Sequence, residues 1–386
     1  MADRKFDYTD RLNFLGEWFD HKCSYLKHFI IKFYPSDNTL ELYDKDLGRM
    51  FLKRTKMEEI TTEDMFVGNT IRVYGRQIKI TDYLDCRTQN NVGKYREKTC
   101  LILKPMVLDK IGEILTVIER NGFAISKLRL CSITRKEAME FYAKRKGDPI
   151  LPSILENLVS GPVLALALIR EDAVKKLQDL LGPADPEEAK LRAPHTLRAL
   201  YGHSHEATNG FHCSEAIEDG PREIEFFFSI NERSPEPVAL FENTTCCLIK
   251  PHAVQEGNVG RIVKSITDSH FKITGAHVVY LSSLNADEFL EVYKGVVSDY
   301  HAFKDGYLNG PCVVLEIGGK LDGVDAQEEF RKLCGPMDSE IARQIRPHTL
   351  RAQFGRDKYL NAVHCTDLPE DVVLELEYLF RVLKDV

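Results

Sequence analysis

The chain has 386 residues, of which 43% are hydrophobic and 29% charged, and its formal net charge is −7. This composition is typical of globular domains and excludes a disordered or collagen-like chain, while the mild, evenly spread acidity argues against nucleic-acid binding. Residues 162–169, the longest apolar run, are too few to span a membrane, and the ten cysteines contain no C-x-x-C pair, so we expect reduced thiols, no membrane association and a cytoplasmic location.

Short aromatic and β-branched runs predict a small β-rich domain over residues 1–92. These runs are 25–34, 39–43, 51–54, 70–74 and 77–81. Turn-forming residues separate them, at Pro35-Ser36-Asp37-Asn38 and at Gly75-Arg76. Because each turn joins neighbouring runs, we expect a compact β-meander.

The rest of the chain repeats itself, and we predict two copies of one domain over 99–228 and 245–386. The segment Pro194–Ala199 returns without change as Pro347–Ala352. Each copy opens with an apolar strand, continues with an amphipathic helix and then returns to a β-rich segment. This alternation within ~130 residues predicts an α+β fold of the ferredoxin-like type, βαββαβ, in each copy.

A lysine, an arginine, a histidine and a glutamate recur in the same order in both copies. The histidines are His212 and His364, and Glu223 and Glu375 each follow their histidine by eleven residues. Neutral imidazole is a competent nucleophile near pH 7, and a carboxylate can fix its tautomer. Lysine and arginine can hold phosphate oxygens. The set predicts phosphoryl transfer through a phosphorylated histidine.

Both copies resemble nucleoside diphosphate kinase domains, which share the opening Lys-Pro, the Gly-Pro, the arginine and an N-x-x-H signature. The resemblance implies that His212, His364, Glu223 and Glu375 are catalytic. It implies that the nucleotide is bound by Lys104, Tyr142, Arg198, Asn209, Ser214, Lys250, Tyr293, Arg331, Arg351 and Asn361. Such kinases transfer the terminal phosphate of ATP or GTP to a nucleoside diphosphate by a ping-pong route, with Mg²⁺ accompanying the nucleotide. We expect no metal site formed by the protein alone.

Each copy departs from the family pattern, so the sequence leaves open whether either copy turns over. Gln178 stands in the first copy where the family has a phosphate-binding arginine, which the second copy keeps as Arg331. The family's base-stacking phenylalanine is replaced by Ile150 in the first copy and by His301 in the second. Loss of an aromatic platform weakens base stacking.

The order of the domains resembles ciliary and centrosomal members of the same family, in which a DM-ten domain precedes two kinase domains. This implies a microtubule inner protein of axonemal doublets, with residues 1–92 as docking module and tubulin and other axonemal proteins as partners. The implied location is the cytoplasm, the cytoskeleton, the axoneme of the cilium or flagellum, and the centrosome. The alternative is a free cytosolic nucleoside diphosphate kinase. We also expect the two copies to pack on each other.

Overall fold

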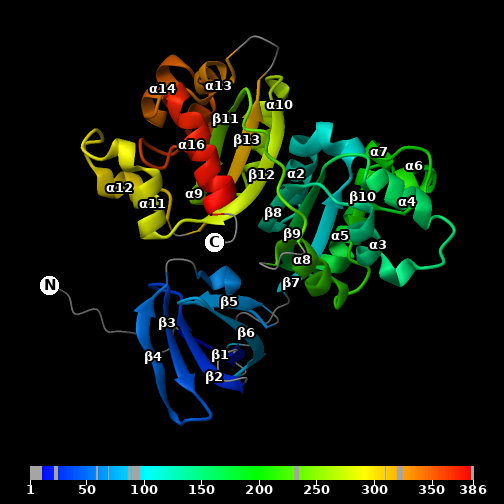
Figure 1. Ribbon diagram of the computed structural model, residues 1–386, viewed down its shortest axis with the longest axis horizontal. Coiled ribbons are helices and arrows are strands. Elements are labelled where there is room, and N and C mark those ends of the chain that lie inside the picture. The colour runs from blue at the N-terminus through cyan, green and yellow to red at the C-terminus, as the bar shows by residue number, and fades with distance from the viewer. Residues whose placement is uncertain are drawn as a thin grey trace. The chain divides into compact units, whose positions relative to one another are not determined.

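The computed structural model describes residues 11–20, 25–57, 60–67, 69–85, 88, 96–229, 234–308, 310–319 and 325–383. The chain forms two compact units, and each is described by itself (Figure 1). The first unit comprises Met1–Arg96 with Leu308–Gly310, and the second comprises the remaining residues. None of the helices in the described ranges combines the length and the apolar character that crossing a membrane requires.

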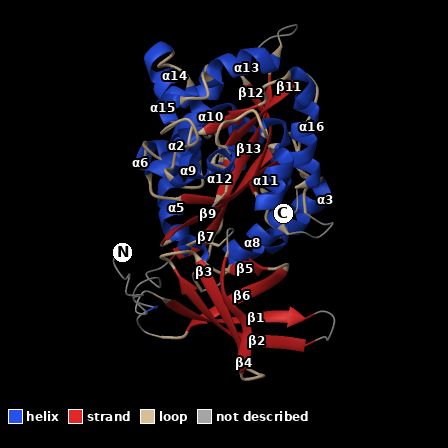
Figure 2. Ribbon diagram, turned by 90° about the vertical axis from the view of Figure 1, so that its left-hand side faces the viewer, coloured by secondary structure: helices blue, strands red, loops and turns tan. Residues whose placement is uncertain are grey.

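The described residues of the first unit form a six-stranded antiparallel sheet in the order β4-β3-β2-β1-β6-β5 (Figure 2). Its strands are β1 Leu12–Asp20, β2 Tyr25–Tyr34, β3 Thr39–Asp44, β4 Arg49–Lys56, β5 Thr70–Val73 and β6 Arg76–Tyr83. The prediction of a β-rich domain is confirmed. The simple meander was wrong in one respect, because β1, which the sequence did not predict, lies between β2 and β6.

The second unit contains both repeats, which share one sheet. Its described residues form eight strands in the order β10-β7-β9-β8-β12-β13-β11-β14. The first copy supplies β7 Arg96–Leu103, β8 Ala124–Cys131, β9 Val163–Glu171 and β10 Phe211–Cys213, and the second supplies β11 Thr244–Ile249, β12 Lys272–Tyr280, β13 Pro311–Gly318 and β14 Val363–Cys365. Each copy thus has its fourth, first, third and second strands side by side, which is the predicted ferredoxin-like order.

Helices cover this sheet in both copies. Those of the first copy are α2 Ile111–Arg120, α3 Arg135–Phe141, α4 Leu151–Leu158, α5 Ala173–Leu181, α6 Pro186–Arg192, α7 Leu197–Tyr201 and α8 Asp219–Phe228. Those of the second are α9 Pro251–Gln255, α10 Val259–Asp268, α11 Ser283–Phe289, α12 Tyr300–Asp305, α13 Ala326–Cys334, α14 Ser339–Ile345, α15 Leu350–Phe354 and α16 Val372–Glu377.

The two copies pack on each other through α2 and α10 and through the edge strands β8 and β12 (Figure 1). Two glycines allow the helices to approach closely. A Cβ on Gly112 would lie 2.4 Å from the backbone of Lys264, and one on Gly260 would lie 2.1 Å from the backbone nitrogen of Thr116. The contact is reciprocal, because Gly112 and Gly260 occupy matching positions. One buried cluster of apolar side chains runs through both copies.

Candidate functional site

In the first copy, the histidine and its glutamate come from a short strand and the helix that follows it. His212 lies on β10, paired with Ile102 of β7, and Glu223 lies on α8. The Nε2 atom of His212 is 3.2 Å from a carboxylate oxygen of Glu223. That distance is within ion-pair range, but Nε2 is buried and its alignment with the carboxylate falls short of a hydrogen bond.

Ser214 holds the same oxygen of the Glu223 carboxylate that faces His212. Its hydroxyl donates to Glu223 at 2.9 Å and accepts from the backbone N–H of Cys100 at 2.9 Å. Both side chains are buried. The carboxylate is therefore held in place through β7, the strand next to His212. Glu223 is positioned to accept a hydrogen bond from the Nε2–H of the histidine.

Aromatic rings surround the imidazole of His212. Phe141 and Tyr142 meet it edge-on, with ring centroids 5.0 and 5.3 Å from that of the histidine. Burial raises the pKa of Tyr142, followed by the charge of Glu223, so its phenol stays protonated. The side chain of His212 keeps 12% of its surface exposed. Among the described residues, none forms a hydrogen bond to its Nδ1 atom.

The predicted cations of the first copy lie in the same region. Lys104 follows β7 and donates to Oδ1 of Asn209 at 3.0 Å and to the carbonyl of Ala207 at 3.4 Å. Burial first, and then the charge of Arg198, lower the pKa of Lys104 to about 7. Arg198 donates to the carbonyl of Gly182 at 2.8 Å, while its buried Nε finds no partner in the described part of the chain.

Gln178 does not supply a cation to this site. Its amide donates to the carbonyls of Ser214 and Glu215, at 3.1 and 3.0 Å, and so supports the loop after His212. The sequence did not single out Arg145, which pairs with Glu206 at 2.8 Å, one residue before Ala207. The only signal for it is a basic run at 144–146, for which the second copy has Val292, Tyr293 and Lys294.

In the second copy, both ring nitrogens of His364 are engaged. Nε2 lies 3.0 and 3.1 Å from the two oxygens of Glu375, and Thr366 donates to the same carboxylate at 2.6 Å. The hydroxyl of Tyr307 lies 3.3 Å from Nδ1. His364 is 3% exposed. The histidine and glutamate meet as in the first copy, but here a tyrosine adds a contact that the sequence did not predict.

The other predicted residues of the second copy bind parts of their own domain. Lys250 donates to the carbonyl of Tyr359 at 2.9 Å, and Arg351 donates to the carbonyls of Val363 and Gly335 at 3.1 and 2.9 Å. A second group gathers around Asp367: the hydroxyl of Tyr293 donates to it at 2.7 Å and Arg331 pairs with it at 3.1 Å. The amide of Asn361 donates to the carbonyl of Met337 at 2.9 Å.

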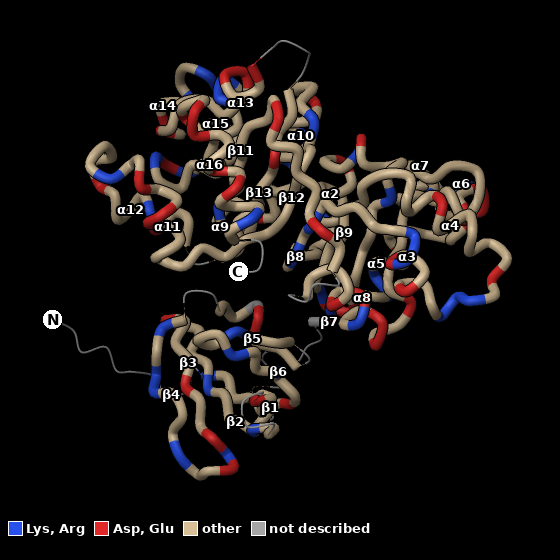
Figure 3. The backbone as a smooth tube through the Cα atoms, viewed as in Figure 1, with Lys and Arg blue, Asp and Glu red and all other residues tan. Residues whose placement is uncertain are grey.

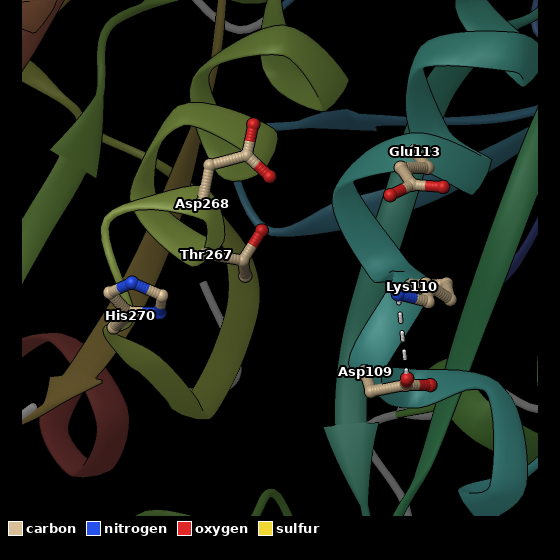
Figure 4. A pocket seen from close by; sticks show the side chains of 6 residues that line it. All are labelled: Asp109, Lys110, Glu113, Thr267, Asp268 and His270. Carbon is tan, nitrogen blue, oxygen red and sulfur yellow. Dashed lines mark ion pairs between the residues drawn. The ribbon is translucent and has the colours of Figure 1, made fainter.

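A separate pocket of about 340 Å³ lies at the contact between the two copies (Figure 4). Asp109, Lys110 and Glu113 line one wall, and Thr267, Asp268 and His270 face them from the other. None of the predicted catalytic residues lines it, so it is distinct from both histidine sites. Across the described ranges, no group of three or more His, Cys, Asp or Glu side chains is placed to bind a metal.

Comparison with known proteins places this geometry in context. The family model for nucleoside diphosphate kinase matches residues 97–233 and 243–384, and the model for the DM10 domain matches residues 3–86. The chain is 42% identical over 376 residues to nucleoside diphosphate kinase homolog 7 of Rattus norvegicus, covering 97% of this chain and 94% of that protein, and the Mus musculus homolog matches with the same values. A solved nucleoside diphosphate kinase of Aquifex aeolicus is 36% identical over 35% of this chain and 96% of its own, with a TM-score of 0.34.

Proposed function

Because the chain belongs to the nucleoside diphosphate kinase family, we propose that its first copy transfers the terminal phosphate of a nucleoside triphosphate to a nucleoside diphosphate through His212. The observation that carries this proposal is the partly exposed imidazole of His212, with Glu223 at 3.2 Å behind it. Lys104 and Arg198 supply positive charge to the same region.

The transfer takes place in two steps, and Nδ1 of His212 carries the phosphoryl group between them. Glu223 accepts the Nε2–H of His212, which leaves the lone pair on Nδ1. Nδ1 attacks the γ-phosphorus, so the N–P bond forms while the bond to the β,γ-bridging oxygen breaks and the nucleoside diphosphate leaves. An oxygen of a second nucleoside diphosphate then attacks the phosphorus, the N–P bond breaks and the imidazole is regenerated.

Lys104 and Arg198 stabilise the charge that builds up on the transferred phosphoryl group. Mg²⁺ enters as part of the nucleotide substrate, held by phosphate oxygens, as is usual for this ion. Replacement of the family's arginine by Gln178 removes one cation, so we expect slow transfer.

A labelling experiment tests this chemistry. The purified chain is incubated with γ-labelled ATP, freed of nucleotide, and then chased with GDP. We expect acid-labile label on the protein and its transfer to GTP, with loss of both in His212→Ala. The exposed His203 gives the control variant His203→Ala, which should label normally. A wild-type chain that takes up no label contradicts the proposal.

We further propose that the chain is a microtubule inner protein of axonemal doublets, located in the cilium or flagellum, with its DM-ten domain as docking module. One feature of that domain supports the proposal. Strand β4 is an edge of the sheet and carries Lys and Arg residues (Figure 3). Of these, Arg49, Lys53 and Lys56 are exposed. A basic edge strand complements the acidic surface of tubulin. The alternative is the free cytosolic kinase.

Co-sedimentation with microtubules separates these two locations. We expect the chain to pellet with stabilised microtubules at low salt and to be released as salt rises, because exposed charges are screened. The double variant Lys53→Glu/Lys56→Glu should weaken pelleting, whereas Lys136→Glu/Lys175→Glu, which changes exposed lysines of the first kinase copy, should not. A chain that stays in the supernatant at low salt favours the cytosolic alternative.

A further inference from the structure

Because the domain is repeated, each residue of the second site can be compared with the residue at the matching position of the first copy. Tyr307 lies between α12 and β13, three residues before Gly310-Pro311. The residue three before Gly161-Pro162 in the first copy is Leu158. Both side chains are buried, at 1% and 0% exposure. The two copies therefore differ here in chemistry and size and not in burial.

The hydroxyl of Tyr307 forms a hydrogen bond to Nδ1 of His364, the nitrogen that phosphoryl transfer requires. The Nε2–H of His364 donates to Glu375, so the ring's lone pair lies on Nδ1. The O–H of Tyr307 donates to this lone pair at 3.3 Å. Burial raises the pKa of Tyr307 well above its usual value, so the hydroxyl keeps its proton. Leu158 has no group that could form such a bond, and Nδ1 of His212 lacks a partner in the described part of the first copy.

The ring of Tyr307 also covers the lysine of the second site. The Nζ atom of Lys250 lies 4.0 Å from the centre of this ring and 5.1 Å from that of Phe303. The two rings are 5.4 Å apart, and Phe303 in turn contacts Tyr293 at 5.1 Å. Lys250 is completely buried. Burial holds its pKa well below the usual range, followed by the charge of Arg351.

We propose that Tyr307 closes the second site, so that His364 is a structural residue and the transfer proposed above is confined to His212. The closure by Tyr307 stands by itself, and only the confinement of transfer to His212 rests on the proposed function. Tyr307 fills the site from within the protein. Its hydroxyl is hydrogen-bonded to Nδ1 of His364, the nitrogen that would attack phosphorus, and its ring contacts Lys250, the cation that would bind phosphate. The domain keeps its fold and its buried polar network while losing access to nucleotide.

Chemical modification of histidines tests the closure without any need for kinase activity. The full chain is treated with diethyl pyrocarbonate, which acylates accessible neutral imidazoles, and the modified peptides are quantified by mass spectrometry over time. In the wild type we expect His364 to react at least about tenfold more slowly than His212, because a buried group reacts only through local opening. Equal rates for the two histidines overturn the proposal.

Two variants identify the residue responsible. Tyr307→Leu copies the first repeat, and we expect it to raise the reaction rate of His364 by about tenfold or more while His212 is unaffected. Tyr307→Phe keeps the ring but removes the hydroxyl from Nδ1, so its rate should lie between those of the wild type and the leucine variant. Tyr307→Met serves the same purpose if the leucine variant does not fold, as judged by circular dichroism. An unchanged rate in a folded leucine or methionine variant contradicts the assignment to Tyr307.

The modification rates of the histidines and the labelling by ATP test the two proposals separately. If the wild-type chain takes no phosphate from ATP, the kinase proposal fails, but the modification rates still report whether Tyr307 closes the site. If His212 is phosphorylated and His364 proves as reactive as His212, the kinase proposal stands and the closure fails.

Discussion

The carboxylate of Glu119 in the first copy accepts a hydrogen bond at 2.7 Å from the backbone N–H of Gly260 in the second. Its other oxygen accepts from the N–H of Val259 at 3.1 Å. Glu119 thus caps the first turn of α10 across the contact between the copies. The matching residue of the second copy is Thr267, which lines the pocket of Figure 4. The two copies are therefore related by an approximate symmetry that this cap breaks.

The cap makes the stability of the second unit depend on pH. Burial raises the pKa of Glu119 from its ordinary 4.5 to about 7, although the two backbone N–H groups act in the opposite direction. Between these values the folded state retains a proton that the unfolded state has released. Stability therefore falls as pH rises through this window and levels off above it. We expect the wild-type Tm to decline relative to that of Glu119→Gln between roughly pH 5 and pH 7. A constant difference contradicts the shift.

The glycine contact between α2 and α10 predicts a sharp steric effect. In Gly260→Ala the new methyl would fall 2.1 Å from the nitrogen of Thr116, and helix backbones cannot yield by that distance without separating. We expect a loss of more than about 2 kcal/mol in the free energy of unfolding. Ser265→Ala, on the same helix, should change it by less than about 0.5 kcal/mol. Denaturant unfolding of both variants decides the matter, and similar midpoints would be inconsistent with the packing.

The low pKa of Lys104 predicts how nucleotide binding depends on pH. Burial first, and then Arg198, place this pKa at about 7, so the lysine loses its charge as pH rises through neutrality. If phosphate binds only the charged form, the Kd for nucleoside diphosphate should rise about tenfold between pH 6 and pH 8. Lys104→Arg keeps its charge and should show a flatter profile. Titration calorimetry measures both, and parallel profiles count against the assignment.

Restoring the missing cation should accelerate the first copy. In Gln178→Arg, a guanidinium replaces the amide near the loop after His212, and we expect phosphorylation of His212 to become about tenfold faster. The variant loses the amide bonds to Ser214 and Glu215. In the second copy, Gln327 supports the equivalent loop from one turn earlier, at 2.8 and 2.9 Å. Val174→Gln/Gln178→Arg therefore copies that arrangement.

The control for this gain is the reverse exchange in the second copy. Arg331→Gln removes the exposed pair with Asp367 at 3.1 Å, and it should leave the labelling rate unchanged. Rapid-quench labelling compares the three variants with the wild type. No acceleration in the single or the double variant would show that charge at residue 178 does not limit transfer.

Sequence patterns predicted the repeated fold because both copies carry strong periodic signals. The apolar face of α10 follows directly from residue spacing. Strand β1 was missed because Gly16 interrupts its pattern. That glycine leaves room for its neighbours, since a Cβ there would lie 2.6 Å from the terminal methyl of Ile31. The pairing of β1 with β6 depends on contacts distant in sequence, which local patterns do not encode.

The repeat also predicted which residues of each site lie together. His212 and Glu223, and likewise His364 and Glu375, meet because a strand and the next helix bring residues eleven apart to one place. Tyr307 had no such signal. It lies 57 residues before His364, and its effect depends on the path of the chain between α12 and β13. The contact of Lys250 with the ring of Tyr307 could not be predicted from its spacing either, because Lys104, at the same spacing and also buried, donates to Asn209 instead.

In the proposed reaction, phosphate is carried by His212 and not by His364. Mass spectrometry of the ATP-treated full chain at neutral to alkaline pH, where phosphohistidine survives, locates the phosphate on individual peptides. We predict phosphate on the peptide containing His212, at a level that falls when nucleoside diphosphate is added, and none on the peptide containing His364. Phosphate on His364, or on neither histidine, would rule out His212 as the phosphate carrier.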